Sequence, residues 1–255
     1  MELVKKYPYK HYNRFSDTTG RKYLVDNIKV PSVTTILSAT KDKRFLDNWR
    51  RKVGDAEADR IMRQASAIGT EMHQVLEYHL TGQGYYNAME EGSKPRMMAK
   101  TILDNIKIDE VWGNEISLEY ENKFAGTADL SCVAYGKPSI VDWKQSNKPK
   151  REEWVDDYKY QLGAYYLAHT KNYGPIEQGV ISICTRDLLY QEFRLNESEL
   201  IAVTIIDNSI ASSKSETKTP GSRITNQKPT VGILLNTFNS IFSIFDTNFT
   251  INTHS

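Results

Sequence analysis

The stretch that decides the fold is Ala125-Gly126-Thr127-Ala128-Asp129-Leu130-Ser131-Cys132-Val133, together with the Ile140-Val141-Asp142-Trp143-Lys144 that follows it. Both segments are dominated by small and aliphatic residues, which predicts two partner strands of a hairpin. Side chains alternate between the two faces of a strand, so Asp142 and Lys144 point the same way. Asp129 stands in the partner strand. The sequence therefore predicts two carboxylates and an ammonium group on adjacent strands.

This combination of side chains suits one kind of chemistry. Aspartate oxygens hold Mg²⁺ or Mn²⁺, which polarises a phosphodiester and lowers the pKa of a bound water. A lysine beside the ion can orient the attacking water and offset charge developing on phosphorus. The alternative is a surface ion pair at a strand end, worth about 0–1 kcal/mol. Acid-x-Lys triplets also occur at Glu121-Asn122-Lys123, Asp157-Tyr158-Lys159 and Glu216-Thr217-Lys218.

The position of Asp142 distinguishes it from the acids of the other triplets, because it alone follows an aliphatic strand and has an Asp-bearing strand before it. Further motifs stand on both sides. With them the chain resembles the PD-(D/E)xK nuclease superfamily in its RecB-like branch, and within that branch the phage and mitochondrial genome maintenance exonucleases. The matches are Gly-Thr-x-x-His at Gly69 to His73, Gly-x-x-Asp at Gly126 to Asp129, Asp-x-Lys at Asp142 to Lys144, and Gln-x-x-x-Tyr at Gln161 to Tyr165.

The resemblance implies an α/β fold with a restriction-endonuclease-like core, in which a mixed sheet of about five strands is flanked by helices. We expect three parts. Residues 1–110 would form an N-terminal hairpin and helical part that contributes to the site, and residues 111–212 the catalytic core. The resemblance covers about residues 12 to 195, so the third part rests on the residues alone: a polar linker composition and then apolar residues at helical intervals predict a linker and a C-terminal helix over residues 213–255.

The resemblance also assigns roles to individual residues. Asp129 and Asp142 would bind Mg²⁺, with Mn²⁺ as a substitute, together with the backbone carbonyl of Trp143. Lys144 would position the water, and Gln161 and Tyr165 would complete the catalytic set. His73 would be a metal neighbour or a phosphate contact. An extra acidic ligand is expected on the preceding strand, with Glu115 the first choice and Glu119 the second.

The expected activity is Mg²⁺-dependent exonuclease action on DNA, with single-stranded ends preferred, in replication, recombination or repair of a phage-type system. Two alternatives remain open. One is a structure-specific endonuclease on the same fold, and the other is a catalytically inactive nucleic-acid-binding module. The intact acids and lysine speak against the inactive module.

Several residues are candidates for DNA contact. Gly69 and Thr70 belong to the helical motif, and Arg50 and Arg51 lie on a short basic helix. The segment from Lys5 to Phe15, which includes Lys10 and Tyr12, interleaves bases with aromatic residues, a composition that can stack on unpaired bases. Its alternative, the better supported of the two, is a surface strand that opens a hairpin at the turn Asp17-Thr18-Thr19-Gly20.

The helical pattern of the N-terminal part is strong. Phe45, Leu46 and Trp49 mark one helix face, and Gly54 ends that helix. A long helix is expected from Asp55 to Leu80. Its inward side would comprise Ala58, Ile61, Met62, Ala65, Ile68, Met72, Val75, Leu76 and His79 or Leu80.

Composition sets wider bounds. The 255 residues carry 33 basic and 32 acidic side chains, so net charge neither supports nor excludes a nucleic-acid partner. Cys132 and Cys184 are too few for the four-cysteine cluster of some RecB-like nucleases, so no iron–sulfur cluster is expected. No apolar run reaches membrane-spanning length. We expect a cytoplasmic protein (host cytoplasm if viral), with a possible protein partner bound through the C-terminal tail.

Overall fold

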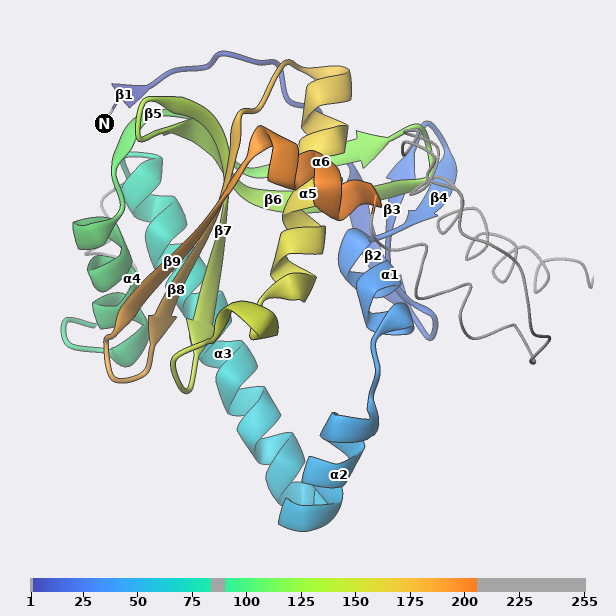
Figure 1. The fold of residues 1–255 in the computed structure, drawn as a ribbon, viewed down its shortest axis with the longest axis vertical. Helices are drawn as coiled ribbons and strands as arrows, with labels where there is room; N and C mark the ends of the chain where they lie inside the picture. The colour runs from blue at the N-terminus through green and yellow to red at the C-terminus, as the bar shows by residue number, and fades with distance from the viewer. Residues whose placement is uncertain (1, 84–89, 206–255) are drawn as a thin grey trace, which may run out of the picture.

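The protein is described from a computed structural model, which defines residues 2–83 and 90–205. Its centre is a mixed six-stranded sheet of order β1-β5-β6-β7-β8-β9, flanked by helices (Figure 1). This architecture confirms the predicted α/β fold and agrees with a restriction-endonuclease-like core. The strands are β1 (Glu2–Leu3), β5 (Ile108–Tyr120), β6 (Phe124–Ala134), β7 (Lys137–Ser146), β8 (Gln178–Thr185) and β9 (Tyr190–Asn196).

The sheet holds one strand more than expected, because the two-residue β1 pairs in parallel with β5 at its edge. Strands β5, β6 and β7 form an antiparallel meander, as the hairpin prediction required. Strand β8 then pairs in parallel with β7, and β9 is antiparallel to β8. A parallel neighbour needs a crossover connection, and here the crossover carries helix α5.

Helices cover both faces of the sheet. Helices α3 (Asp55–Leu80) and α4 (Lys94–Asn105) pack on one face, where Leu76 and Met98 meet Trp143 of β7 in one core cluster. The other face carries α1 (Val33–Thr40), the 3-10 helix η2 (Glu152–Trp154), α5 (Asp156–Asn172) and α6 (Glu197–Ile205). The N-terminal helices thus share a core with the sheet of the proposed catalytic part.

A second, three-stranded sheet consists of β2 (Asn13–Asp17), β3 (Gly20–Val25) and β4 (Ile28–Pro31). It confirms the predicted hairpin, whose turn is closed by the Thr19 backbone N–H donating to Asp17 Oδ1 at 2.8 Å. Tyr12, Tyr23 and Val30 form a small apolar core beneath it. Ser32, the N-cap of α1, accepts a hydrogen bond from Thr35 N at 3.0 Å.

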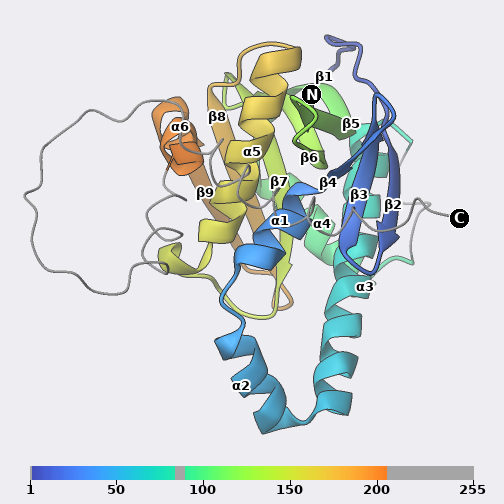
Figure 2. The ribbon, with the colours of Figure 1, turned by 90° about the vertical axis from the view of Figure 1, so that its right-hand side faces the viewer.

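Helix α2 (Arg44–Val53) and the first half of α3 project away from the body (Figure 2). No residue of α2 is buried, and Phe45 is 85% exposed. The expected inward side of α3 is therefore wrong for Met62, which is 45% exposed, and Ile61 and Ala65 are only half-buried. Ala58 is buried as predicted, and Ile68 packs against the core of the body. The buried residues of α3 are Ala58, Met72, Val75, Leu76 and Leu80.

Cys132 and Cys184 are free, buried thiols, as expected for core cysteines. Within residues 2–83 and 90–205, no helix combines the length and apolarity needed to span a membrane. The predictions for residues 213–255, including the C-terminal helix and its protein partner, lie outside the described residues.

Candidate active site

Three carboxylates lie in a row across the meander. In the β5–β6 ladder Asn114 pairs with Leu130 and Ile116 with Ala128, so Glu115 and Asp129 stand opposite each other. Leu130 pairs with Val141 in the β6–β7 ladder, and the next step of that register brings Asp129 opposite Asp142. Directly opposed residues on antiparallel strands share a face. The sheet itself therefore gathers Glu115, Asp129 and Asp142.

Strands β6 and β7 separate where Asp129 and Asp142 lie. The β6–β7 ladder ends at the Leu130–Val141 pair, and beyond it the Trp143 backbone N–H donates to Asp129 Oδ2 at 2.7 Å. A side chain thus takes the place of a backbone acceptor and fixes the carboxylate. Glu115 has φ 48°, a left-handed conformation that costs about 1 kcal/mol or more for a residue other than glycine. Strain of this kind is concentrated at functional sites.

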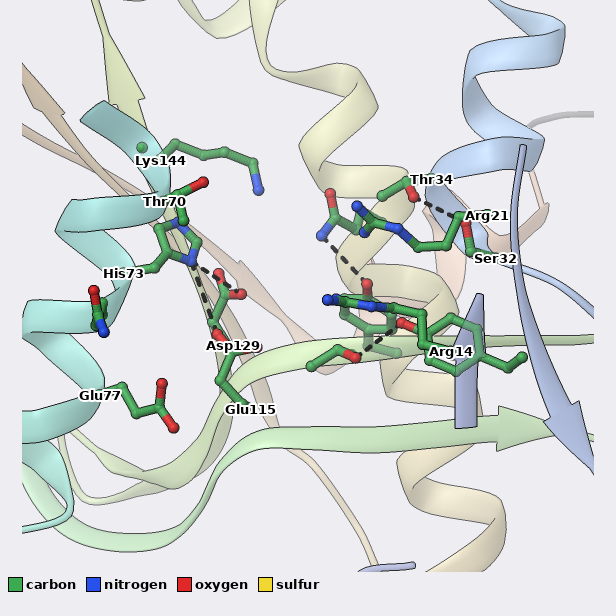
Figure 3. Close-up of a pocket in the computed structure, with 17 residues that line it drawn as sticks. Arg14, Arg21, Ser32, Thr34, Thr70, His73, Glu77, Glu115, Asp129 and Lys144 are labelled. Atoms are coloured by element: carbon green, nitrogen blue, oxygen red, sulfur yellow. Dashed lines mark hydrogen bonds and ion pairs between the residues drawn. The ribbon is translucent and has the colours of Figure 1, made fainter. Parts of the chain in front are cut away.

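Helix α3 places His73 against this row (Figure 3). His73 Nδ1 lies 3.5 Å from Asp129 Oδ1 and 3.9 Å from Glu115 Oε1. Its Nε2 lies 3.0 Å from the Trp143 carbonyl oxygen, which sequence analysis expected to be a metal ligand. One ligand atom each from His73, Glu115 and Asp129 lies within 4.8 Å of the others.

Both ring nitrogens of His73 face acceptor oxygens, an arrangement that suits the doubly protonated imidazolium. Burial alone would lower the His73 pKa, but the charge of Asp129 and hydrogen bonds to Asp129 and Glu115 outweigh it and raise the pKa to about 10. The pKa of Asp129 is correspondingly lowered, because the neighbouring positive charges outweigh its burial. His73 thus places a positive charge between two carboxylates.

Asp142, Lys144 and Gln161 form the second half of the predicted catalytic set. Asp142 is 1% exposed, its Oδ2 lies 2.5 Å from Lys144 Nζ, and its Oδ1 accepts from Gln161 Nε2 at 2.8 Å. Burial raises the pKa of Asp142 to about 6 despite the lysine beside it. Burial would lower the pKa of Lys144, but Asp142 and Asp129 raise it, so the lysine stays charged.

Helix α5 positions Gln161 by packing closely on β6. The ring of Tyr165, one turn after Gln161, lies over Gly126, where an added Cβ would meet the ring at 2.6 Å. Tyr165 is 3% exposed, so it is a core residue as well as a residue that lines the site. The glycine of the Gly-x-x-Asp motif thus allows α5 to approach the acids.

Most of these residues line one pocket of about 610 Å³, a volume typical of ligand sites. The predicted metal ligands Asp142 and Trp143 are not among its lining residues, because both are buried behind it. The pocket includes the predicted His73, Glu115, Asp129, Lys144, Gln161 and Tyr165, and also Gly69 and Thr70. No sequence motif indicated the other lining residues, which come from the hairpin, the start of α1, the exposed side of α3 and β6. They are Arg14, Arg21, Tyr23, Ser32, Thr34, Gln74, Glu77 and Thr127.

Some expected contacts lie elsewhere. The predicted contact of Tyr12 with DNA is wrong, because its ring is buried in the small apolar core and is not available for stacking on a base. Lys10 does not line the pocket, and its backbone N–H donates to the Tyr173 hydroxyl at 3.2 Å. Arg50 pairs with Asp55 and Asp59 at the elbow between α2 and α3.

Arg51, the other basic residue expected on α2, donates to Asn48 and does not line the pocket. Glu119, the second choice for an acidic ligand, accepts from Asn122 N at 3.2 Å near the end of β5. It does not line the pocket either. The structure thus brings Glu115, and not Glu119, to the acids of β6 and β7.

Comparisons with known proteins give limited similarity. No protein-family model matches the chain. Mitochondrial genome maintenance exonuclease 1 of Mus musculus is 28% identical over 172 residues, 62% of this chain and 50% of the relative. The Homo sapiens protein of that name is 26% identical over 171 residues, with the same shares. The chain therefore spans about half the length of these curated relatives. A solved structure, that of SSO0001, aligns over 73% of this chain and 77% of its own at 18% identity, with a TM-score of 0.38, too low to carry an argument.

Proposed function

We propose that this protein is a divalent-metal-dependent DNA exonuclease that prefers single-stranded ends. The observation that carries the proposal is the gathering of His73, Glu115 and Asp129 in a pocket that Lys144, the ion-pair partner of the buried Asp142, also lines. The similarity to two exonucleases supports the same activity. The processing of DNA ends would serve replication, recombination or repair, in a phage-type system.

The residues present fit a hard divalent cation. Glu115 and Asp129 offer carboxylate oxygens and His73 an imidazole nitrogen, a donor set compatible with Mn²⁺ as well as Mg²⁺. Asp142, one strand away in the same row, would add a further oxygen. A cation held there would supply Lewis-acid polarisation of the phosphodiester and a bound water of lowered pKa.

The chain's own residues have separate tasks. Lys144 Nζ projects from the acidic row into the pocket, where an ammonium group can orient water and stabilise charge developing on phosphate oxygens. Gln161 holds Asp142 through its amide N–H and so fixes the carboxylate that neighbours the lysine. Neither task requires a conformational change, because both side chains are already anchored by hydrogen bonds or ion pairs.

The preference for free single-stranded ends is motivated by the helices around the pocket. Ser32 and Thr34 at the start of α1 line one side, and Gly69 to Glu77 of α3 line another. Helix α2 links α1 to α3 away from the body, so the connection loops past the site (Figure 2). A strand that entered between these helices would have to be threaded from an end, and a flexible single strand threads more readily than a duplex.

End-labelled linear DNA tests the proposal. Purified protein should shorten the single-stranded form progressively in Mg²⁺ or Mn²⁺ and more slowly attack the duplex, and EDTA should stop both reactions. RNA of the same sequence measures the selectivity for DNA. Undiminished cleavage in excess EDTA would exclude a metal-dependent reaction. Internal cuts without progressive shortening would favour the alternative of a structure-specific endonuclease.

A further inference from the structure

Two arginines of the pocket have no role in the chemistry described above. Arg14 of β2 and Arg21 of β3 line it, and neither side chain has an ion pair or hydrogen bond among residues 2–83 and 90–205. Most other arginines in the same ranges have such partners, for example Arg44 with Asp42 and Arg60 with Glu57. Figure 3 shows both guanidinium groups pointing toward the half of the pocket that holds Lys144, His73 and Asp129.

The strand register places the two arginines together. Arg14 pairs with Tyr23 and Ser16 with Arg21 in the antiparallel β2–β3 ladder. Arg14 and Arg21 are therefore diagonal neighbours on one face of the sheet. Such neighbours are separated by about 7–8 Å, a distance that long side chains can bridge. Like charges on one face repel each other mildly, and an anion bound between them would relieve this repulsion.

The hairpin that carries them is held firmly against the body. The Arg21 backbone N–H donates to Thr35 Oγ1 at 2.9 Å, and its carbonyl accepts from Ser32 N at 2.9 Å. The Tyr23 hydroxyl is hydrogen-bonded to Thr127 Oγ1 of β6 at 2.9 Å. Both arginines thus start from fixed backbone positions at a set distance from the acidic row.

The charges of the pocket are divided between two sides. Glu115, Asp129 and Glu77 lie on one side, and no oxygen of these acids is within the 4.0 Å of an ion pair with Arg14 or Arg21. Within residues 2–83 and 90–205, no acidic side chain therefore neutralises the cationic side. Arginine suits phosphate, because its planar fork can donate two parallel hydrogen bonds to one phosphate group.

A second hollow continues from this side. Arg21 and Thr34 also line a pocket of about 450 Å³ between the hairpin turn and α1. Its other lining residues are small, hydroxyl-bearing or basic, namely Ser16, Thr18, Thr19, Gly20, Thr35, Ser38, Ala39 and Lys43. A chain of phosphates leaving the acidic row past the arginines would find further donors there and no carboxylate.

We propose that Arg14 and Arg21 form a phosphate subsite separate from the site of hydrolysis, which binds a non-scissile phosphate of the DNA strand. The inference rests on the proposed function and gives the strand a path, from the acidic row over the hairpin toward Lys43. Its occupant is either an internal phosphodiester or the phosphomonoester of a strand end. Both share the chemistry that two unpaired guanidinium groups recognise.

The test measures binding of a fluorescent single-stranded oligonucleotide in EDTA over a range of salt concentrations. Each phosphate contact contributes about 0.7 to the slope of log affinity against log salt for single strands. Arg14→Gln and Arg21→Gln should each lower the slope by about that amount, and the double variant by about twice as much. Arg14→Lys and Arg21→Lys keep the positive charge, so these variants should largely retain the wild-type slope.

Lys22→Gln is the matched control, because Lys22 follows Arg21 on the same strand, points to the opposite face and pairs with Asp17. Its slope should equal that of the wild type. Unchanged slopes in both single arginine variants to Gln and in the double variant would overturn the subsite. A wild-type protein that does not bind the oligonucleotide would overturn it too. A lowered slope in a protein that cleaves no DNA in Mg²⁺ would overturn the proposed function and leave the subsite standing.

Oligonucleotides with a 5′-phosphate, a 3′-phosphate or two hydroxyl ends identify the occupant. If wild type prefers one phosphorylated end and the double variant loses this preference, the occupant is a phosphomonoester. If the double variant weakens binding of all three equally, the occupant is an internal phosphodiester.

Discussion

His73 holds a positive charge at the proposed site of the divalent ion. Its two nitrogens face the Trp143 carbonyl oxygen and the carboxylates of Glu115 and Asp129, and its pKa is raised to about 10. A group with a raised pKa keeps its proton below that pKa. Near neutral pH a metal must therefore displace the His73 proton before it can use the imidazole nitrogen.

The affinity for Mn²⁺ should consequently rise with pH between about 7 and 9, as the proton becomes easier to displace. Calorimetry at pH 8 in buffers of different ionisation enthalpy should show release of about one proton per Mn²⁺ bound. His73→Gln, which keeps a polar side chain without a titratable proton, should bind more weakly and release none. Equal proton release by the variant would exclude His73 as the source.

The role of Lys144 gives a second prediction for a single residue. If its ammonium group stabilises the transition state, Lys144→Ala should lower the single-turnover cleavage rate by about 10²-fold or more. Binding of Mn²⁺ should change little. A structural ion pair with Asp142 would instead show as lost thermal stability with the rate preserved, so melting curves measured on the same samples separate the two roles.

The sequence predicted the residues that come from contiguous motifs but not those assembled by register. His73, Asp129, Asp142, Lys144 and Gln161 each belong to a short motif, and the structure places all of them at one site. Arg14 and Arg21 belong to no motif, because their position depends on how a separate hairpin docks on β6. Tyr12 was misplaced for the same reason, since composition does not show which side of a strand is covered.

At the scale of elements, the approach of α5 to β6 decides where Gln161 and Tyr165 lie. Gly126→Ala would place a methyl group 2.6 Å from the Tyr165 ring. We expect a loss of about 1–3 kcal/mol in the free energy of unfolding, as for other overpacked cores. Cleavage should fall with it, because Gln161 would move away from Asp142.

Gly69→Ala is the control for this prediction. Gly69 also belongs to a motif, but an added Cβ would meet only Gln145 Cγ, at 3.4 Å, and this flexible side chain can shift. Removing a helix-interior glycine gains up to about 1 kcal/mol. Urea unfolding should show Gly69→Ala as neutral or stabilising, and a loss equal to that of Gly126→Ala would contradict the packing described here.

The elements themselves were largely predictable. The bounds of α3, from Asp55 to Leu80, and the hairpin at Asp17 to Gly20 follow from local glycine, capping and periodicity signals. The exposure of the first half of α3, which projects from the body, was not predictable, because its Ile61 and Met62 recur at helical spacing as core residues do. Periodicity identifies an apolar side but does not show whether anything packs against it.

For the whole molecule, the loop formed by α1, α2 and α3 predicts a dependence on free ends. Linear single-stranded DNA should be degraded, and the circular form of the same sequence should survive under the same conditions. A circle nicked once by another nuclease serves as the control and should become a substrate. Equal degradation of intact circles and linear strands would reject threading and favour the endonuclease.

We propose that the row of acids beside His73 and Lys144 is a metal-dependent site of phosphodiester hydrolysis. The most direct test of this proposal is the single-turnover cleavage of end-labelled single-stranded DNA over a range of Mg²⁺ concentrations by wild type, Asp129→Asn and Glu119→Gln. Glu119 lies on the same meander outside the pocket. Wild type and Glu119→Gln should show the same saturable dependence on Mg²⁺, and Asp129→Asn should bind DNA without cleaving it. Cleavage by Asp129→Asn at the wild-type rate would show that Asp129 is not part of a metal-dependent site of hydrolysis.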